Sequence, residues 1–160
     1  MAPSTSIRRR PALLLLAAAA LAAGAAWRAS GTETSRPLAW SDVSAQIAGI
    51  ELPRAVAITL RSGGGLADFE RQVTPGLQPR PVRVDFRRRE LVLVSPGPRS
   101  STGYGVRVEQ LVEQRRRVLL VVSEVTPALG DAVRPGVTYP YVLLSIPRVD
   151  KRVDVDWLGH

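Results

Sequence analysis

Residues 84–106 read VDFRRRELVLVSPGPRSSTGYGV, and the interpretation of the whole chain starts from this stretch. We interpret Val84–Val94 as a strand, the Pro-, Gly- and Ser-rich residues after it as a loop, and Tyr104 as the opening of a second strand. The run Leu91–Val94 is entirely apolar, which is typical of a strand covered on both faces. From Tyr104 onward apolar and polar residues alternate, which predicts a half-buried strand.

The rest of the chain reads mainly as further strands joined by turns. The predicted strands are a buried one at Ala55–Leu60, a returning one at Val118–Val122, one at Val142–Ile146 and a last amphipathic one at Val153–Trp157. Leu38–Trp40 is expected to begin ordered structure and to pack its tryptophan.

One short helix is predicted between these strands. Leu66, Phe69 and Val73 recur at the spacing of one helix face, directly after Ser62–Gly65, which we interpret as a turn. Ala128–Val137 is expected to be a long loop because it contains Gly-Asp and Pro-Gly pairs. The pattern predicts a mainly β fold with one short helix: a compact antiparallel β-sandwich, of which the immunoglobulin-like arrangement is one form, or a barrel.

The first residues have the layout of an export signal. Arg8–Arg10 are followed by an apolar run to Leu21 and then by small residues, so residues 1–27 are predicted to be a signal peptide. The alternative is an uncleaved membrane anchor, although the apolar segment is short for a bilayer span. We expect residues 28–37 to form a linker and residues 38–160 a single β-rich domain. The protein is then exported, and is periplasmic, secreted or associated with the cell envelope.

Composition argues against most catalytic chemistry. The chain has no cysteine, which excludes disulfides, thiol nucleophiles and thiolate metal sites. Its one histidine is His160, so a Ser-His-Asp triad or a multi-histidine zinc site is not expected. The net charge of +8 comes from scattered arginines, and Arg115–Arg117 fits a solvated turn better than an anion-binding patch. We expect no enzyme activity, cofactor, metal or nucleic-acid partner.

The carboxylates also have structural explanations. Asp154 and Asp156 alternate with apolar residues in the last predicted strand, where charges keep an edge soluble more often than they catalyse. Asp85 is expected to cap a turn or to pair with a nearby arginine. The tyrosines beside loops either hydrogen-bond the adjacent loop or contact a partner. The candidate protein-contact residues lie in two loops, and they are Ser101, Thr102, Gly103, Tyr104, Tyr139, Pro140 and Tyr141.

An ordered set of motifs between Pro81 and Arg148 resembles the C-terminal domain of the protease complex subunit PrcB family. The motifs in chain order are Asp85-Phe86, Leu91–Val94, Gly97, Ser101–Tyr104, Pro127, and Pro140-Tyr141 before Val142–Ile146. The chain departs from the family pattern at Ser101-Thr102, where the family often has Thr-Gly. The resemblance covers residues 81–148, which is nearly half the chain.

The resemblance implies an accessory role in proteolysis. It suggests an exported, non-enzymatic domain that binds another protein, such as a secreted or surface protease, and stabilises it. The Thr-Gly-Tyr loop is also similar to a loop of chagasin-like protease inhibitors, so inhibition is the alternative function. A third hypothesis is an envelope module that binds a glycan or other ligand, for which Trp40 and Trp157 are the available tryptophans. Membrane contact is expected only through residues 1–27, if they are retained.

Overall fold

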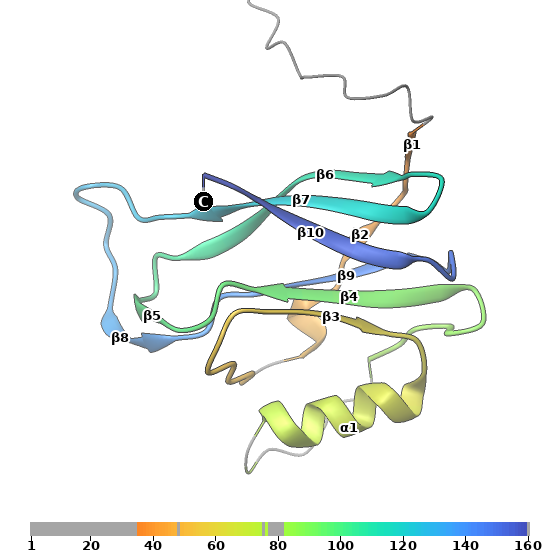
Figure 1. Ribbon diagram of the computed structural model, residues 1–160. Helices are drawn as coiled ribbons and strands as arrows, with labels where there is room; N and C mark the ends of the chain where they lie inside the picture. The colour runs from red at the N-terminus through yellow and green to blue at the C-terminus, as the bar shows by residue number, and fades with distance from the viewer. Residues whose placement is uncertain (1–34, 48, 75, 77–81, 160) are drawn as a thin grey trace, which may run out of the picture. The chain divides into compact units, whose positions relative to one another are not determined.

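Two four-stranded sheets and one helix make up most of the computed structural model, which describes residues 35–47, 49–74, 76 and 82–159 (Figure 1). The predicted signal segment, and the predicted linker as far as residue 34, lie outside the described residues. One sheet has the order β1-β6-β7-β10 and the other the order β2-β9-β4-β3. The strands of the first sheet are β1 (Arg36–Pro37), β6 (Gly105–Glu113), β7 (Arg117–Val125) and β10 (Arg152–Leu158). Those of the second are β2 (Ser41–Asp42), β9 (Val142–Pro147), β4 (Arg89–Ser95) and β3 (Val56–Leu60).

The second sheet is the middle layer of the fold because both of its faces are covered. Alternate side chains of β4 enter two different apolar cores: Leu91 and Leu93 pack in a core with the helix α1 (Gly63–Val73), whereas Val92 and Val94 face the first sheet. All four side chains are almost completely buried. This arrangement explains the uninterrupted apolar run, since a strand with only one covered face needs only alternate apolar residues. The predicted sandwich is confirmed, and the alternative of a closed barrel is wrong.

The helix confirms one prediction and corrects another. Leu66, Phe69 and Val73 are buried on one face of α1, as their spacing predicts. The glycines before them are not a separate turn, because the helix already begins at Gly63. Ser62 precedes it as the N-cap, and its hydroxyl accepts a hydrogen bond of 3.1 Å from the Gly65 amide. A capped helix can therefore start with glycines that would otherwise be poor helix formers.

The start of β4 also differs from the prediction. Residues 84–88 are not a strand; Asp85 instead organises a turn before β4 begins at Arg89. Its carboxylate accepts a hydrogen bond from the Arg87 amide at 3.0 Å, and its carbonyl accepts bonds from the Arg88 and Arg89 amides. The predicted turn-capping role of Asp85 is thus confirmed.

Sheet order corrects the interpretation of three other segments. β3 lies at the edge of its sheet, so Ala55–Leu60 is not a fully buried strand. β10 pairs with β7 in parallel, although we expected antiparallel sheets throughout. A short strand β8 (Pro135–Thr138), which begins within the predicted long loop, pairs with β5 (Arg99–Ser101). A further correction concerns Trp40, which is predicted to be packed. It is 44% exposed, and the nearby Leu38 is buried instead.

The predicted turn of the β6–β7 hairpin is confirmed by a hydrogen bond of 2.8 Å from the Gln114 amide to the Arg117 carbonyl. Within the hairpin, the pairing shifts register between Val108 and Gln110, which marks a β-bulge at Glu109. A 3₁₀ helix, η1 (Ser44–Gln46), follows β2. None of the helices in the described part of the chain is long and apolar enough to cross a membrane.

Candidate functional site

The loop residues predicted to contact a protein come from two segments that the structure joins. β5 contains Ser101, and β8 leads into Tyr139, so the β5–β8 pairing holds the two loops side by side (Figure 1). The hydroxyl of Thr138 donates a hydrogen bond of 2.6 Å to the Ser101 carbonyl. Thr102 and Arg134 exchange two further bonds, of 3.1 and 3.0 Å. We call β5, β8 and residues 126–134, which connect β7 to β8, the β5–β8 surface.

Gly103 is required by close packing beneath this surface. A side-chain carbon at position 103 would lie 2.6 Å from the Cβ of Pro127 and 2.6 Å from a methyl carbon of Val133. Real side-chain carbons do not approach this closely, and neither neighbour has a long flexible end that could move aside. Gly103 and Pro127 both belong to the motif set identified in the sequence, and their contact gives that set a physical reason.

An ion pair fixes the β5 end of the surface to the first sheet. The guanidinium of Arg99 forms a two-pronged pair with Glu124 of β7, with Nη2 2.8 Å from Oε2, and it also donates to the carbonyls of Pro96 and Pro98. The hydrogen bond to Glu124 raises the pKa of Arg99, so its charge is retained at every ordinary pH. A planar guanidinium suits this role because it presents several donors in one fixed geometry.

Four of the seven predicted contact residues border one hollow. Tyr104, Tyr139, Pro140 and Tyr141 line a hollow of about 470 Å³ together with Gly105 and residues of η1. Ser101, Thr102 and Gly103 do not line it; they lie in β5 and the turn after it. The structure therefore divides the predicted residues between a tyrosine-lined hollow and the adjoining β5–β8 surface.

Tyr141 has a structural role within this hollow. Its half-buried hydroxyl lies 2.6 Å from the Ile47 carbonyl and 3.0 Å from the Ser44 carbonyl, so its proton has two acceptors. Burial, assisted by the negative charge of Asp42, raises the pKa of the Tyr141 phenol above 10. The hydroxyl thus stays a donor and holds η1 against β9.

Ser95 and Gly97 connect the hollow to the edge strand β3. The Ser95 hydroxyl donates to the Pro140 carbonyl at 2.7 Å and accepts from the Gly97 amide at 3.1 Å. Gly97 has a φ of +87°, and a side chain there would come within 2.9 Å of the Ala55 backbone nitrogen. Only glycine satisfies both conditions.

The exposed apolar residues were not identified from the sequence. Five large apolar side chains of the described residues are exposed, and three of them, Leu129, Val133 and Val137, lie on the β5–β8 surface. Leu129 is fully exposed, and Val137 is 69% exposed. Each stands close to a glycine or proline, and apolar residues in such turn-forming sequence were the available signal. Exposed apolar groups gathered on one surface are typical of a protein-binding site.

Among the described residues, no cluster of three His, Cys, Asp or Glu side chains could hold a metal ion. The groups that the site does present include exposed apolar side chains and the three tyrosines that line the hollow.

Comparison with known proteins supports the family resemblance. No curated protein and no solved structure matches the chain. A family model described as PrcB C-terminal matches residues 91–147, which run from the third residue of β4 to the end of β9. The matched span contains the Gly103–Pro127 contact, the β5–β8 pair and Pro140-Tyr141. Residues 91–147 thus match the PrcB C-terminal family.

Proposed function

We propose that this chain is an exported, non-catalytic subunit that binds and stabilises an extracytoplasmic protease. The observation that carries the proposal is the set of exposed apolar residues Leu129, Val133 and Val137 on a surface inside the family-matched span. The match of residues 91–147 to the PrcB C-terminal family supports association with a protease complex. The sequence pattern of residues 1–27 supports export.

The β5–β8 surface is suited to binding because it is held in place before any partner arrives. Three interactions hold it in place: the Arg99–Glu124 pair, the Thr102–Arg134 bonds and the Gly103–Pro127 contact. A preorganised surface loses little conformational entropy on association, so more of the apolar contact appears as affinity. Leu129 and Val137 can then be buried by a partner at no cost in internal packing.

The test is crosslinking and co-purification of the full chain in its native host. Recovery of a protease with the wild-type chain is expected, and the double variant Leu129→Ser/Val137→Ser should lose it. Trp40→Ser is the matched control, because Trp40 is also exposed and apolar but lies outside the β5–β8 surface. Recovery of the same protease with the double variant would show that this surface is not the contact.

Adding the purified chain to the recovered protease separates stabilisation from inhibition. A stabilising subunit lengthens the half-life of proteolytic activity at elevated temperature and leaves the initial rate unchanged. A fall in the initial rate, proportional to the amount of chain added, would support the chagasin-like alternative in place of the proposal.

A further inference from the structure

The two large sheets have four outer strands, and three of them are protected against pairing with another chain. β1 and β2 are only two residues long, and β1 contains Pro37. β10 is longer, but it carries Arg152, Asp154 and Asp156. Short length, proline and charge are the usual means by which proteins prevent an edge strand from recruiting a further strand.

The fourth outer strand, β3, has none of these protections. Its sequence Val-Ala-Ile-Thr-Leu contains no charge, proline or glycine, and it pairs on one side only, with β4. In the described part of the chain no strand pairs with its other side. Its outer backbone N–H and C=O groups have no strand partner among these residues, and they are the groups that an added strand would use.

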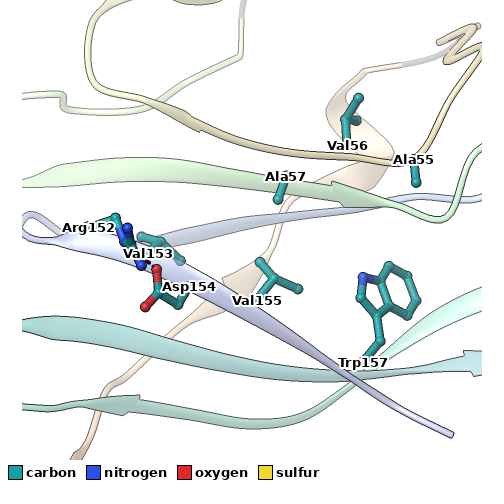
Figure 2. Close-up of a pocket in the computed structure, with 8 residues that line it drawn as sticks. All are labelled: Ala55, Val56, Ala57, Arg152, Val153, Asp154, Val155 and Trp157. Atoms are coloured by element: carbon teal, nitrogen blue, oxygen red, sulfur yellow. Dashed lines mark hydrogen bonds and ion pairs between the residues drawn. The ribbon is translucent and has the colours of Figure 1, made fainter. Parts of the chain in front are cut away.

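A groove lies beside this open edge, between β3 and β10. Its volume is about 510 Å³, and Figure 2 shows Ala55 and Ala57 of its upper wall pointing toward Val155 and Trp157 of β10. The small alanines leave room for side chains of an added strand, since side chains of neighbouring strands project to the same faces. A strand placed along β3 would therefore direct alternate side chains into this groove, which is lined by alanine, valine and tryptophan side chains and also by Arg152 and Asp154.

Charge at the start of β3 distinguishes between possible occupants. Arg54 is exposed and has no ion-pair partner among the described residues, whereas Arg61 after β3 pairs with the buried Glu90 at 2.7 Å. Antiparallel pairing of β3 with a second copy, centred on Ile58, would place Arg54 of each copy opposite Ser62 of the other. A second copy would thus offer Arg54 no carboxylate in this register, so a strand that carries a carboxylate there is favoured.

We propose that the outer edge of β3 is a strand-addition site for an extended apolar segment of another protein that carries a carboxylate beside Arg54. Backbone hydrogen bonds to β3 supply affinity, the groove selects small or β-branched side chains, and Arg54 selects an acidic end. This site is separate from the β5–β8 surface and does not depend on the protease-binding proposal.

The probe is a synthetic peptide, acetyl-Glu-Val-Thr-Val-Thr-Val-Glu-amide, titrated into the ¹⁵N-labelled full chain and followed by NMR. Glutamate at both ends places one beside Arg54 whichever direction the peptide takes. The amide signals of residues 55–60 are expected to shift, and the same peptide with lysine ends should bind at least fivefold more weakly. No shift of these amides with either peptide would overturn the proposal.

Charge reversal tests the part assigned to Arg54. Arg54→Glu should weaken binding of the glutamate-ended peptide about fivefold, the effect of losing one exposed charge pair, and should strengthen binding of the lysine-ended one. Arg116→Glu is the matched control, because Arg116 is exposed in the β6–β7 turn. Equal binding by both variants would refute the role of Arg54.

Dilution of the chain without peptide tests the second-copy occupant. Amide shifts at residues 55–60 that depend on protein concentration would mean that β3 pairs with itself, contrary to the proposal. These readouts concern residues of β3 alone, so their failure is distinguishable from failure of the Leu129→Ser/Val137→Ser test.

Discussion

The β5–β8 surface and the edge of β3 offer a partner different kinds of atoms. On the β5–β8 surface the two short strands pair with each other, and the exposed contact groups are the side chains Leu129 and Val137. At β3 the side chains are small or turned inward, and one side of the backbone is open. The first surface is therefore expected to recognise a partner's shape, and the second to accept many sequences of suitable charge and size.

This comparison depends on the β5–β8 surface being rigid, and the largest expected effect comes from breaking its packing. Gly103→Val forces a side chain against Pro127 and Val133 and should lower the free energy of unfolding by about 3 kcal/mol. Urea denaturation measures the loss. Gly105→Ala is the control from the same motif, because its nearest side-chain contact would be an ordinary 3.6 Å from Val125. Similar losses for both variants would mean that steric crowding at position 103 is not the cause.

A smaller effect is expected from removing the ion pair that ties β5 to β7. Arg99→Ala leaves the largely buried Glu124 carboxylate without its guanidinium and should cost about 2 kcal/mol, reduced by partial exposure of the pair. Hydrogen exchange should accelerate in β5 and β8 and stay unchanged in β3. Arg99→Lys keeps the charge but loses the fork, so its loss should be intermediate. Faster exchange in β3 as well would show that the two surfaces are not independent.

The smallest expected effect on stability concerns Glu70 in helix α1, which packs against the second sheet. Glu70 of α1 is buried, and its Oε1 has no hydrogen-bond partner among the described residues. Burial raises the pKa of Glu70 above 4.5, so the folded state holds this proton more tightly than the unfolded chain does. Between the two pKa values the free energy of unfolding consequently falls as pH rises.

Glu70→Gln removes this cost. It should raise the free energy of unfolding by about 1 kcal/mol at pH 7, and the gain should vanish as pH falls below 4.5. Thermal denaturation of both proteins from pH 3 to pH 8 measures the difference. A gain that does not change with pH would show that the carboxyl charge is not responsible. The variant should leave contacts of Leu129 and Val137 unchanged, which makes it a stability control for both surfaces.

The sequence predicted those parts of the fold in which burial leaves a periodic pattern. Leu91–Val94 indicated a strand covered on both faces, and Leu66, Phe69 and Val73 indicated the buried face of α1. The relative direction of two paired strands leaves no such pattern, because the side chains of a strand alternate between its faces in the same way whether its neighbour is parallel or antiparallel. The parallel pairing of β10 with β7 was missed for this reason.

Predictions from local sequence were wrong where one residue changes the structure that its neighbours adopt. Ser62 caps the helix and so converts three glycines from an apparent turn into its first turn. Asp85 likewise holds a turn that resembles the start of a strand. β8 is exposed along most of its length, so no apolar alternation marked it.

The candidate site was predicted in part. Tyr104, Tyr139, Pro140 and Tyr141 were proposed together, and they border one hollow. Their role in contact stays a prediction. Leu129 and Val137 were not identified from the sequence. Each is next to a glycine, but this signal is weak because the exposure of an apolar residue follows mainly from tertiary packing.

Gly97 has a consequence for how closely the chain can place its two surfaces. It lies in the segment that leads from β4 to β5, and a side chain at this position would come within 2.9 Å of the Ala55 backbone nitrogen, just before β3. Any larger residue at position 97 would have to push this segment away from the start of β3. The spacing between the two surfaces thus depends on one residue that has no side chain.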